Sequence, residues 1–178
     1  EYKQGIPQGA VKKVGSTRDH GTSILFEADP EIFMEIEFDA KKIKTRLRQQ
    51  AYLTPSIRMT LNDERVKGKE ESYSFYFEGG LSSFVKYLLR GRSPRHENIF
   101  YAKGEKEEII VETAFQYSDE FEIYEEGFAN NIHTPEGGTH ITGFRSALTR
   151  TINDYGKKNN ILKGDEVLTG DDVREGMT

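Results

Sequence analysis

Two histidines and a glutamate lie close together in one stretch of the sequence, at His133, Glu136 and His140. Imidazole and carboxylate groups bind metal ions, so these three residues are the first candidates for a metal site. Their spacing does not match a known zinc motif, and a histidine in a loop more often forms hydrogen bonds or faces solvent. We therefore predict no metal site.

The glycine pair Gly137-Gly138 precedes a threonine and a helical pattern. Backbone N–H groups at such a position can bind an anion, but the lysine and the glycine spacing of a phosphate-binding loop are missing. Pro135 restricts its own φ, and the two glycines can adopt the positive φ values of a sharp reversal. We predict a structural hinge at Gly137 and Gly138, with Thr139 as the N-cap of the next helix.

Apolar residues then recur at helical spacing and predict an amphipathic helix with one buried stripe. The stripe comprises Ile141, Phe144, Leu148, Ile152 and Tyr155. Arg145 and Arg150 lie off the stripe, so their guanidinium groups are predicted to face solvent, a partner or a phosphate. The sequence alone leaves these three possibilities open.

Two further charged groups are candidates for chemistry. The acidic residues Asp119, Glu120, Glu122, Glu125 and Glu126 alternate with apolar ones, which favours the solvent side of a strand over a catalytic pair. A basic group occupies a predicted helix and comprises Lys41, Lys42, Lys44, Arg46 and Arg48. It could face DNA, but a solvated face is the favoured interpretation, because the same helix has a core face with Ile43 and Leu47.

Strands and helices of both periodicities are predicted to position these residues. The expected strands cover residues 11–14, 23–28, 57–61, 73–77, 99–102, 109–117 and 121–129, and the expected helices begin near Asp29-Pro30, run from Asp39 to Tyr52, over 81–89 and from Thr139, and start again at Thr169. Asp172 follows Thr169 at the spacing of a capping box. A domain boundary is predicted at Gly79-Gly80, where the period changes from that of a strand to that of a helix.

Composition limits the class of protein. The 178 residues are 35% hydrophobic and 31% charged, and they suffice for one ordinary domain or two small ones. The formal net charge of −5 argues against a nucleic-acid-binding polycation, so any DNA contact must be local. Because the chain has no cysteine, no long apolar span and no signal-peptide pattern, we expect a soluble, cytoplasmic protein without a membrane partner.

The run from Asn130 to Arg150 closely resembles the B-subunit family of bacterial type IIA DNA topoisomerases, which contains DNA gyrase B and its paralogue topoisomerase IV B. Further segments resemble the same family in the expected order, namely Gly21 to Phe26, Thr45 to Arg48, Phe77 to Val85 and Leu168 to Gly176. The resemblance covers nearly the whole chain. It implies an α+β fold in which residues 1–79 are the C-terminal part of a GHKL-type ATPase domain, and residues 80–178 are part of a transducer domain similar to domain 2 of ribosomal protein S5. We expect this second domain to be truncated at its C-terminal end.

The resemblance also implies a function: the parent subunit couples ATP binding and dimer closure to DNA strand passage. Its cofactors are ATP and Mg²⁺, but the family's general base, its Mg²⁺ ligand and its phosphate-sensing lysine match nothing in this chain. No productive cofactor binding is therefore expected from these 178 residues alone, and enzymatic activity is expected only of the parent. Thr22 matches a threonine that helps to hold the adenine, although a threonine beside a turn glycine is also common in a strand without any such role.

For DNA, Arg145 matches a family arginine that faces the cavity of the closed dimer, and Arg150 is a weaker candidate. The implied partners are DNA, a second B subunit and the topoisomerase A subunit. Three alternatives stay open: a non-catalytic structural or DNA-binding module, a topoisomerase IV B subunit, and a GHKL relative of the MutL type. The last of these lacks the Asn-Asn and Gly-Gly-Thr-His run.

Overall fold

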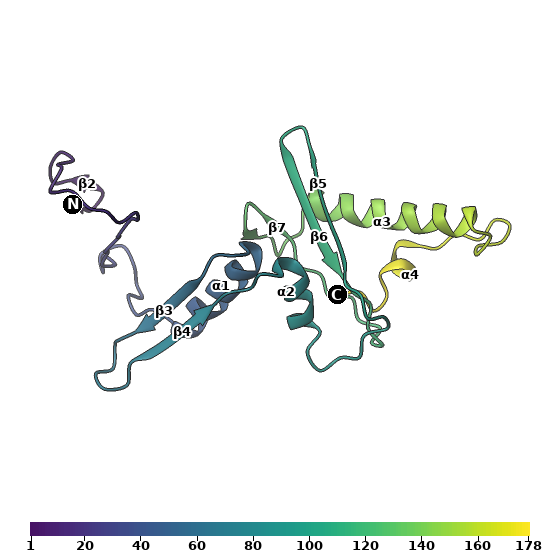
Figure 1. Ribbon diagram of the computed structural model, residues 1–178, viewed down its shortest axis with the longest axis horizontal. Helices are drawn as coiled ribbons and strands as arrows, with labels where there is room; N and C mark the ends of the chain where they lie inside the picture. Colours follow the sequence, from purple (N-terminus) through teal and green to yellow (C-terminus); the bar gives the residue numbers. More distant parts are fainter. The chain divides into compact units, whose positions relative to one another are not determined.

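The computed structural model describes all 178 residues and divides into two compact units, residues 1–40 and 41–178 (Figure 1). The chain contains both helices and separate antiparallel two-stranded sheets, which agrees with the predicted α+β class. In chain order the elements are β1 (Tyr2–Lys3), β2 (Ile6–Pro7), α1 (Ala40–Leu53), β3 (Met59–Asp63), β4 (Glu71–Phe75), α2 (Gly80–Leu88), β5 (Phe100–Lys106), β6 (Ile109–Phe115), β7 (Phe128–Ala129), β8 (Ile132–His133), α3 (Thr139–Lys158) and α4 (Gly170–Arg174). None of the helices combines the length and the apolar character that a membrane span needs.

The first unit contains little regular structure. The strands predicted over residues 11–14 and 23–28 are absent, and the helix predicted at Asp29 amounts to one turn, in which the Asp29 carbonyl accepts from the N–H of Phe33. Val11 and Leu25 are almost fully exposed. An isolated hairpin is only marginally stable, and within this unit no third strand or helix covers an apolar face, so alternation alone was insufficient.

The hairpin of β3 and β4 follows the predicted alternation. Leu61 pairs with Tyr73 and Met59 with Phe75, and these four side chains lie on the more buried face. The helix before the hairpin starts at Ala40, directly after Asp39, close to the predicted bounds. Its buried end carries Tyr52.

An aromatic cluster joins this first half of the second unit to α2. The Tyr52 ring stacks on Phe77 with centroids 3.8 Å apart and on Phe84 with centroids 4.9 Å apart. Gly80 starts α2 with φ +50°, a backbone conformation that favours glycine, and it lies against Pro55. The predicted change of period at Gly79-Gly80 therefore coincides with the start of a helix.

The long hairpin of β5 and β6 follows, and α2 contacts both of its strands, β6 more extensively than β5. Phe115, at the end of β6, is buried together with Phe84, Val85 and Leu89 of the α2 region. The strand predicted over 121–129 is largely wrong, because only Phe128–Ala129 pairs, as β7. Residues 121–126 form no continuous ladder, since a single backbone hydrogen bond reaches them, from the N–H of Tyr124 to the carbonyl of Met177.

The last residues extend the base of β6. Thr178 and Gln116 exchange both backbone hydrogen bonds, at 2.9 and 3.0 Å, and Met177 is only 2% exposed. Before this pairing, α4 begins with the predicted capping box, in which Thr169 accepts from the N–H of Asp172. The short helix thus returns the chain to the sheet.

Candidate functional site

The β7–β8 hairpin precedes the predicted hinge and turns on two asparagines. Asn130 and Asn131 adopt φ values of +48° and +63°. Two consecutive left-handed residues form the tight turn that matches the twist of paired strands, and asparagine tolerates this conformation well. The hairpin is closed by Thr134, whose N–H donates to the Gly127 carbonyl at 2.8 Å.

The glycine pair adopts the positive φ values that the sequence predicts. Gly137 has φ +78° and Gly138 has φ +150°. A Cβ on Gly138 would lie 2.8 Å from Cε1 of His140, whereas one on Gly137 would meet nothing. The N-cap of α3 is Gly138 and not Thr139, because the chain turns one residue earlier than the threonine pattern predicted. A hinge movement at these glycines stays a prediction.

The two histidines of this segment have separate roles. His140 Nε2 forms a hydrogen bond with Oγ1 of Thr134 at 3.0 Å, while the His133 ring lies 5.3 Å from the Phe128 ring. No group of three or more histidine, aspartate or glutamate side chains is arranged to hold a metal ion. His140 therefore ties the start of α3 to the end of the hairpin.

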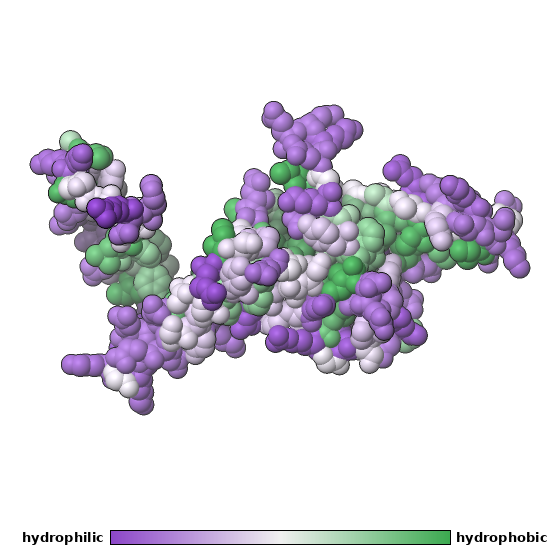
Figure 2. Space-filling view, viewed as in Figure 1, coloured by the Kyte–Doolittle hydropathy of each residue, from purple (hydrophilic) through white to green (hydrophobic).

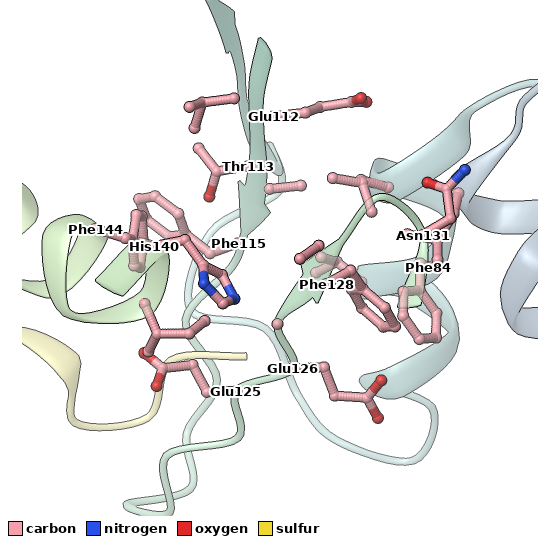
Figure 3. Close-up of a pocket in the computed structure, with 18 of the residues that line it drawn as sticks. Phe84, Glu112, Thr113, Phe115, Glu125, Glu126, Phe128, Asn131, His140 and Phe144 are labelled. Atoms are coloured by element: carbon pink, nitrogen blue, oxygen red, sulfur yellow. The ribbon is translucent and has the colours of Figure 1, made fainter. Parts of the chain in front are cut away.

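A cavity of about 550 Å³ separates α3 from α2 and the β7–β8 hairpin. Figure 3 shows Phe144 and His140 on the α3 side, Phe84 and Phe128 opposite, and the carboxylates of Glu125 and Glu126 along one edge. Apolar surface also continues beneath the hydrophilic outer side of α3 (Figure 2). The predicted stripe holds for Ile141, Phe144, Leu148 and Ile152, which are half-buried, but not for Tyr155, which is 62% exposed.

Glu125 and Glu126 do not form the solvent side of a strand. Glu125 binds the guanidinium group of Arg145, and this hydrogen bond and charge raise the pKa of Arg145. Glu126 accepts from the hydroxyl of Tyr124 at 2.5 Å. Burial, followed by this bond, raises the pKa of Tyr124 to about 12. Both carboxylates are therefore tied to neighbouring side chains.

Glu126 also belongs to a polar junction that the sequence did not indicate. Arg46 and Gln50 of α1 donate to the carbonyl of Asn131 at 3.0 and 2.6 Å, and Gln49 donates to Glu126 at 3.2 Å. We call this set of contacts the α1–hairpin junction. Its members are about 80 residues apart along the chain, so no local pattern could have predicted it.

The basic face of α1 is only partly solvated. Lys44 Nζ lies 3.9 Å from the centroid of the Tyr73 ring, and Arg48 donates to the hydroxyl of Tyr87 at 2.6 Å. The prediction of a solvated face is thus wrong for Lys44 and Arg48, because neighbouring aromatic rings attract both cations. Half-buried in this way, the two side chains do not form an open DNA-facing surface.

The remaining predicted site residues lie apart. Arg150 is exposed on α3, five residues beyond Arg145 and therefore about 140° further around the helix axis. Thr22 is exposed in an irregular part of the first unit. The strand that the sequence predicted directly after it, over residues 23–28, does not form. Its contact with adenine, and the contacts of the two arginines with DNA, stay predictions.

Comparison with known proteins identifies relatives over the whole chain. The family model for DNA gyrase B matches residues 80–178. The DNA gyrase B protein of Bacillus mycoides is 46% identical over 100% of this chain and 44% of the relative, and that of Thermotoga maritima is 44% identical over 99% of this chain and 28% of the relative. The chain therefore spans less than half the length of these curated relatives.

Solved structures agree with the sequence comparison. The 43K ATPase domain of Thermus thermophilus gyrase B, solved in complex with an aminocoumarin, has a TM-score of 0.71 and 39% identity, and the match covers 84% of this chain and 40% of that one. Over the matched residues the two proteins share an α+β fold.

Proposed function

The chain belongs to the DNA gyrase B family, and on that premise we propose that it is the junction between the ATPase and transducer domains of a type IIA topoisomerase B subunit. We propose gyrase B over topoisomerase IV B, because the curated relatives from Bacillus mycoides and Thermotoga maritima are gyrase proteins. In this proposal residues 1–79 belong to the ATPase domain and residues 80–178 to the transducer. The start of the family match at residue 80 supports this division.

The observation that carries the proposal is the α1–hairpin junction. It joins α1, on the ATPase side of Gly79-Gly80, to the β7–β8 hairpin on the transducer side. Two donors converge on one carbonyl oxygen, and one of them is charged, so the contact resists separation more than a single neutral bond would. A shift of α1 is therefore passed to the hairpin.

The hairpin leads directly to Gly137 and Gly138, and these lead to α3. Positive φ at both glycines concentrates the freedom of the backbone at this point. We assign the pair as the hinge at which α3 reorients when α1 moves. Movement at a few residues between packed elements is the usual form of a domain-closure step.

DNA is the proposed partner of the exposed side of α3. Arg145 lies there, Arg150 is also exposed but about 140° further around the helix axis, and guanidinium groups bind phosphate oxygens without reading sequence. The further proposed partners are a second B subunit and the topoisomerase A subunit, and the proposed location is the cytoplasm, where bacterial DNA lies.

We propose that the residues of this chain do not by themselves hold ATP with Mg²⁺ productively. Thr22, the one residue that matches the family's nucleotide site, is exposed in an irregular segment. We therefore assign ATP hydrolysis to the longer subunit and expect no turnover from the 178-residue chain in a coupled assay. Clear Mg²⁺-dependent turnover by the purified chain would contradict this assignment.

The test of the proposed function uses the complete subunit reconstituted with its A subunit. Arg46→Ala combined with Gln50→Ala removes both donors to Asn131. We expect ATP hydrolysis to continue while the supercoils introduced per ATP fall several-fold, and Gln8→Ala, at an exposed position in the first unit, serves as the control. An equal loss of hydrolysis and supercoiling, or no loss of either, would count against a coupling role. Reconstituted subunits that relax DNA without supercoiling it would favour topoisomerase IV B.

A further inference from the structure

The ion pair between Glu125 and Arg145 has an unusual arrangement. Two guanidinium nitrogens, Nε and Nη2, donate to the same carboxylate oxygen, Oε2, with Nε at 2.9 Å. The other oxygen, Oε1, is buried and has no hydrogen-bond partner. The Arg145 side chain is 47% exposed, whereas that of Glu125 is 16% exposed. The carboxylate is thus the fixed member of the pair, and the arginine faces outward.

The other arginine pairs of the chain differ from this one. In Arg92–Glu120 and Arg174–Asp171 the arginine is the more buried partner, with side-chain exposures of 23% and 14%. Arg65 is more exposed, but Asp63 lies only two residues away in the same loop. Arg145 alone among these four arginines is both exposed and held by a distant carboxylate.

This arrangement determines how much positive charge Arg145 presents to an anion that approaches α3. While Glu125 holds Arg145, the carboxylate neutralises the guanidinium charge, and the negative charge of Asp171 also acts on it. A phosphate must therefore compete with Glu125 for the same nitrogens. The Arg145 side chain is 47% exposed, so solvent and salt screen its side of the pair, and a phosphate can reach the guanidinium group from solvent.

We propose that Glu125 is a positioning residue that restrains Arg145, and that a DNA phosphate binds Arg145 by taking the place of the Glu125 carboxylate. This inference rests on the proposed function, which assigns DNA to the exposed side of α3. Glu125 weakens DNA binding, because it competes with phosphate for Arg145, and it also holds the guanidinium group in one position. DNA affinity should therefore rise when the charge of Glu125 is removed.

The experiment measures binding of a fluorescently labelled duplex of about 20 base pairs to the 178-residue chain by anisotropy over a series of salt concentrations. Because each phosphate contact contributes about 0.9 to the slope of log K against log salt, Glu125→Gln is expected to steepen that slope by up to about 0.9. It is also expected to tighten binding about fivefold at low salt. Arg145→Ala should weaken binding, and the double variant should bind like Arg145→Ala.

Two controls separate position from charge. Glu120→Gln removes the same charge from a pair whose arginine is less exposed, so it should tighten binding much less than Glu125→Gln. Glu125→Asp keeps the charge and should bind like the unchanged chain. Thermal melts identify any variant that fails to fold. If Glu125→Gln does so, Glu125→Ala, which removes the same charge and keeps Arg145, is measured in its place.

The outcomes distinguish the inference from the function on which it rests. If Arg145→Ala binds DNA as well as the unchanged chain does, the proposed DNA contact of Arg145 fails. If Arg145→Ala weakens binding but Glu125→Gln does not strengthen it, only the positioning role of Glu125 is overturned. Equal tightening by Glu120→Gln and Glu125→Gln overturns it as well, as does the absence of binding by Glu125→Gln at the lowest salt.

Discussion

The side-chain amide of Asn153 in α3 pairs with both backbone groups of Leu168. Its Oδ1 accepts from the N–H of Leu168 at 2.8 Å, and its Nδ2 donates to the Leu168 carbonyl at 2.9 Å. The same Nδ2 donates to the Thr149 carbonyl, and Asn153 is only 9% exposed. One side chain thus joins α3 to the segment that leads into α4.

We expect Asn153→Ala to lower the free energy of unfolding by about 1–3 kcal/mol, because it leaves the N–H and carbonyl of Leu168 without their partner. Asn153→Asp should cost more, since a carboxylate would face that carbonyl. Urea denaturation of the chain measures both. The matched control is Asn159→Ala at the exposed end of α3, expected within about 0.5 kcal/mol of the unchanged chain. Similar losses at both positions would show that Asn153 has no special role.

The two hinge glycines should respond differently to substitution. Gly137→Ala introduces a Cβ into open space but keeps a positive φ, so we expect a loss of about 1 kcal/mol. Gly138→Ala should lose more, because its Cβ would also press on the His140 ring. Adding His140→Ala to Gly138→Ala should recover part of the loss after correction for His140→Ala alone. Equal losses at the two glycines would contradict this contact.

The α1–hairpin junction predicts a local effect in the isolated chain. Gln50→Ala removes a 2.6 Å bond to the Asn131 carbonyl, so the hairpin should open more often. We expect amide hydrogen exchange over residues 128–134 to accelerate about fivefold, which corresponds to the loss of about 1 kcal/mol from one hydrogen bond. Exchange over β3 and β4 should not change and provides the internal reference. Unchanged exchange in the hairpin would show that the bond does not support it.

Alkaline pH should weaken the fold through Tyr124. Its pKa is about 12 in the folded chain and 10.0 in the reference state, so the folded chain holds this proton more tightly than the unfolded chain does. The stabilisation is therefore fully present below about pH 10 and is lost as pH rises towards 12. In thermal melts between about pH 9 and 11, Tyr124→Phe should show a smaller loss of stability with rising pH than the unchanged chain. Parallel pH profiles would assign the loss to other groups.

Local patterns predicted those elements whose neighbours in space are also neighbours in sequence. Alternation identified the β3–β4 hairpin and its buried face, helical spacing identified α2, and the Thr169–Asp172 capping box identified the start of α4. These signals were sufficient because a hairpin, an amphipathic helix and a cap each satisfy their own hydrogen bonds over a few residues. The run from Asn130 to Arg150 likewise indicated the family that the comparisons established.

The tertiary structure decided those features that depend on a contact with a residue far away in the sequence. Residues 11–14 and 23–28 alternate like strands but have no sheet to join, and residues 121–126 form no ladder because only the backbone of Met177 bonds to theirs. The partners of Asn153, Arg145 and Asn131 follow the same rule, since each contact joins residues 15 or more positions apart and leaves no period in the sequence. The sequence alone therefore determined the family, most of the helices and the positive φ of Gly137 and Gly138. Only the folded chain decided which side chains restrain them, because pairing over long separations depends on where the elements meet.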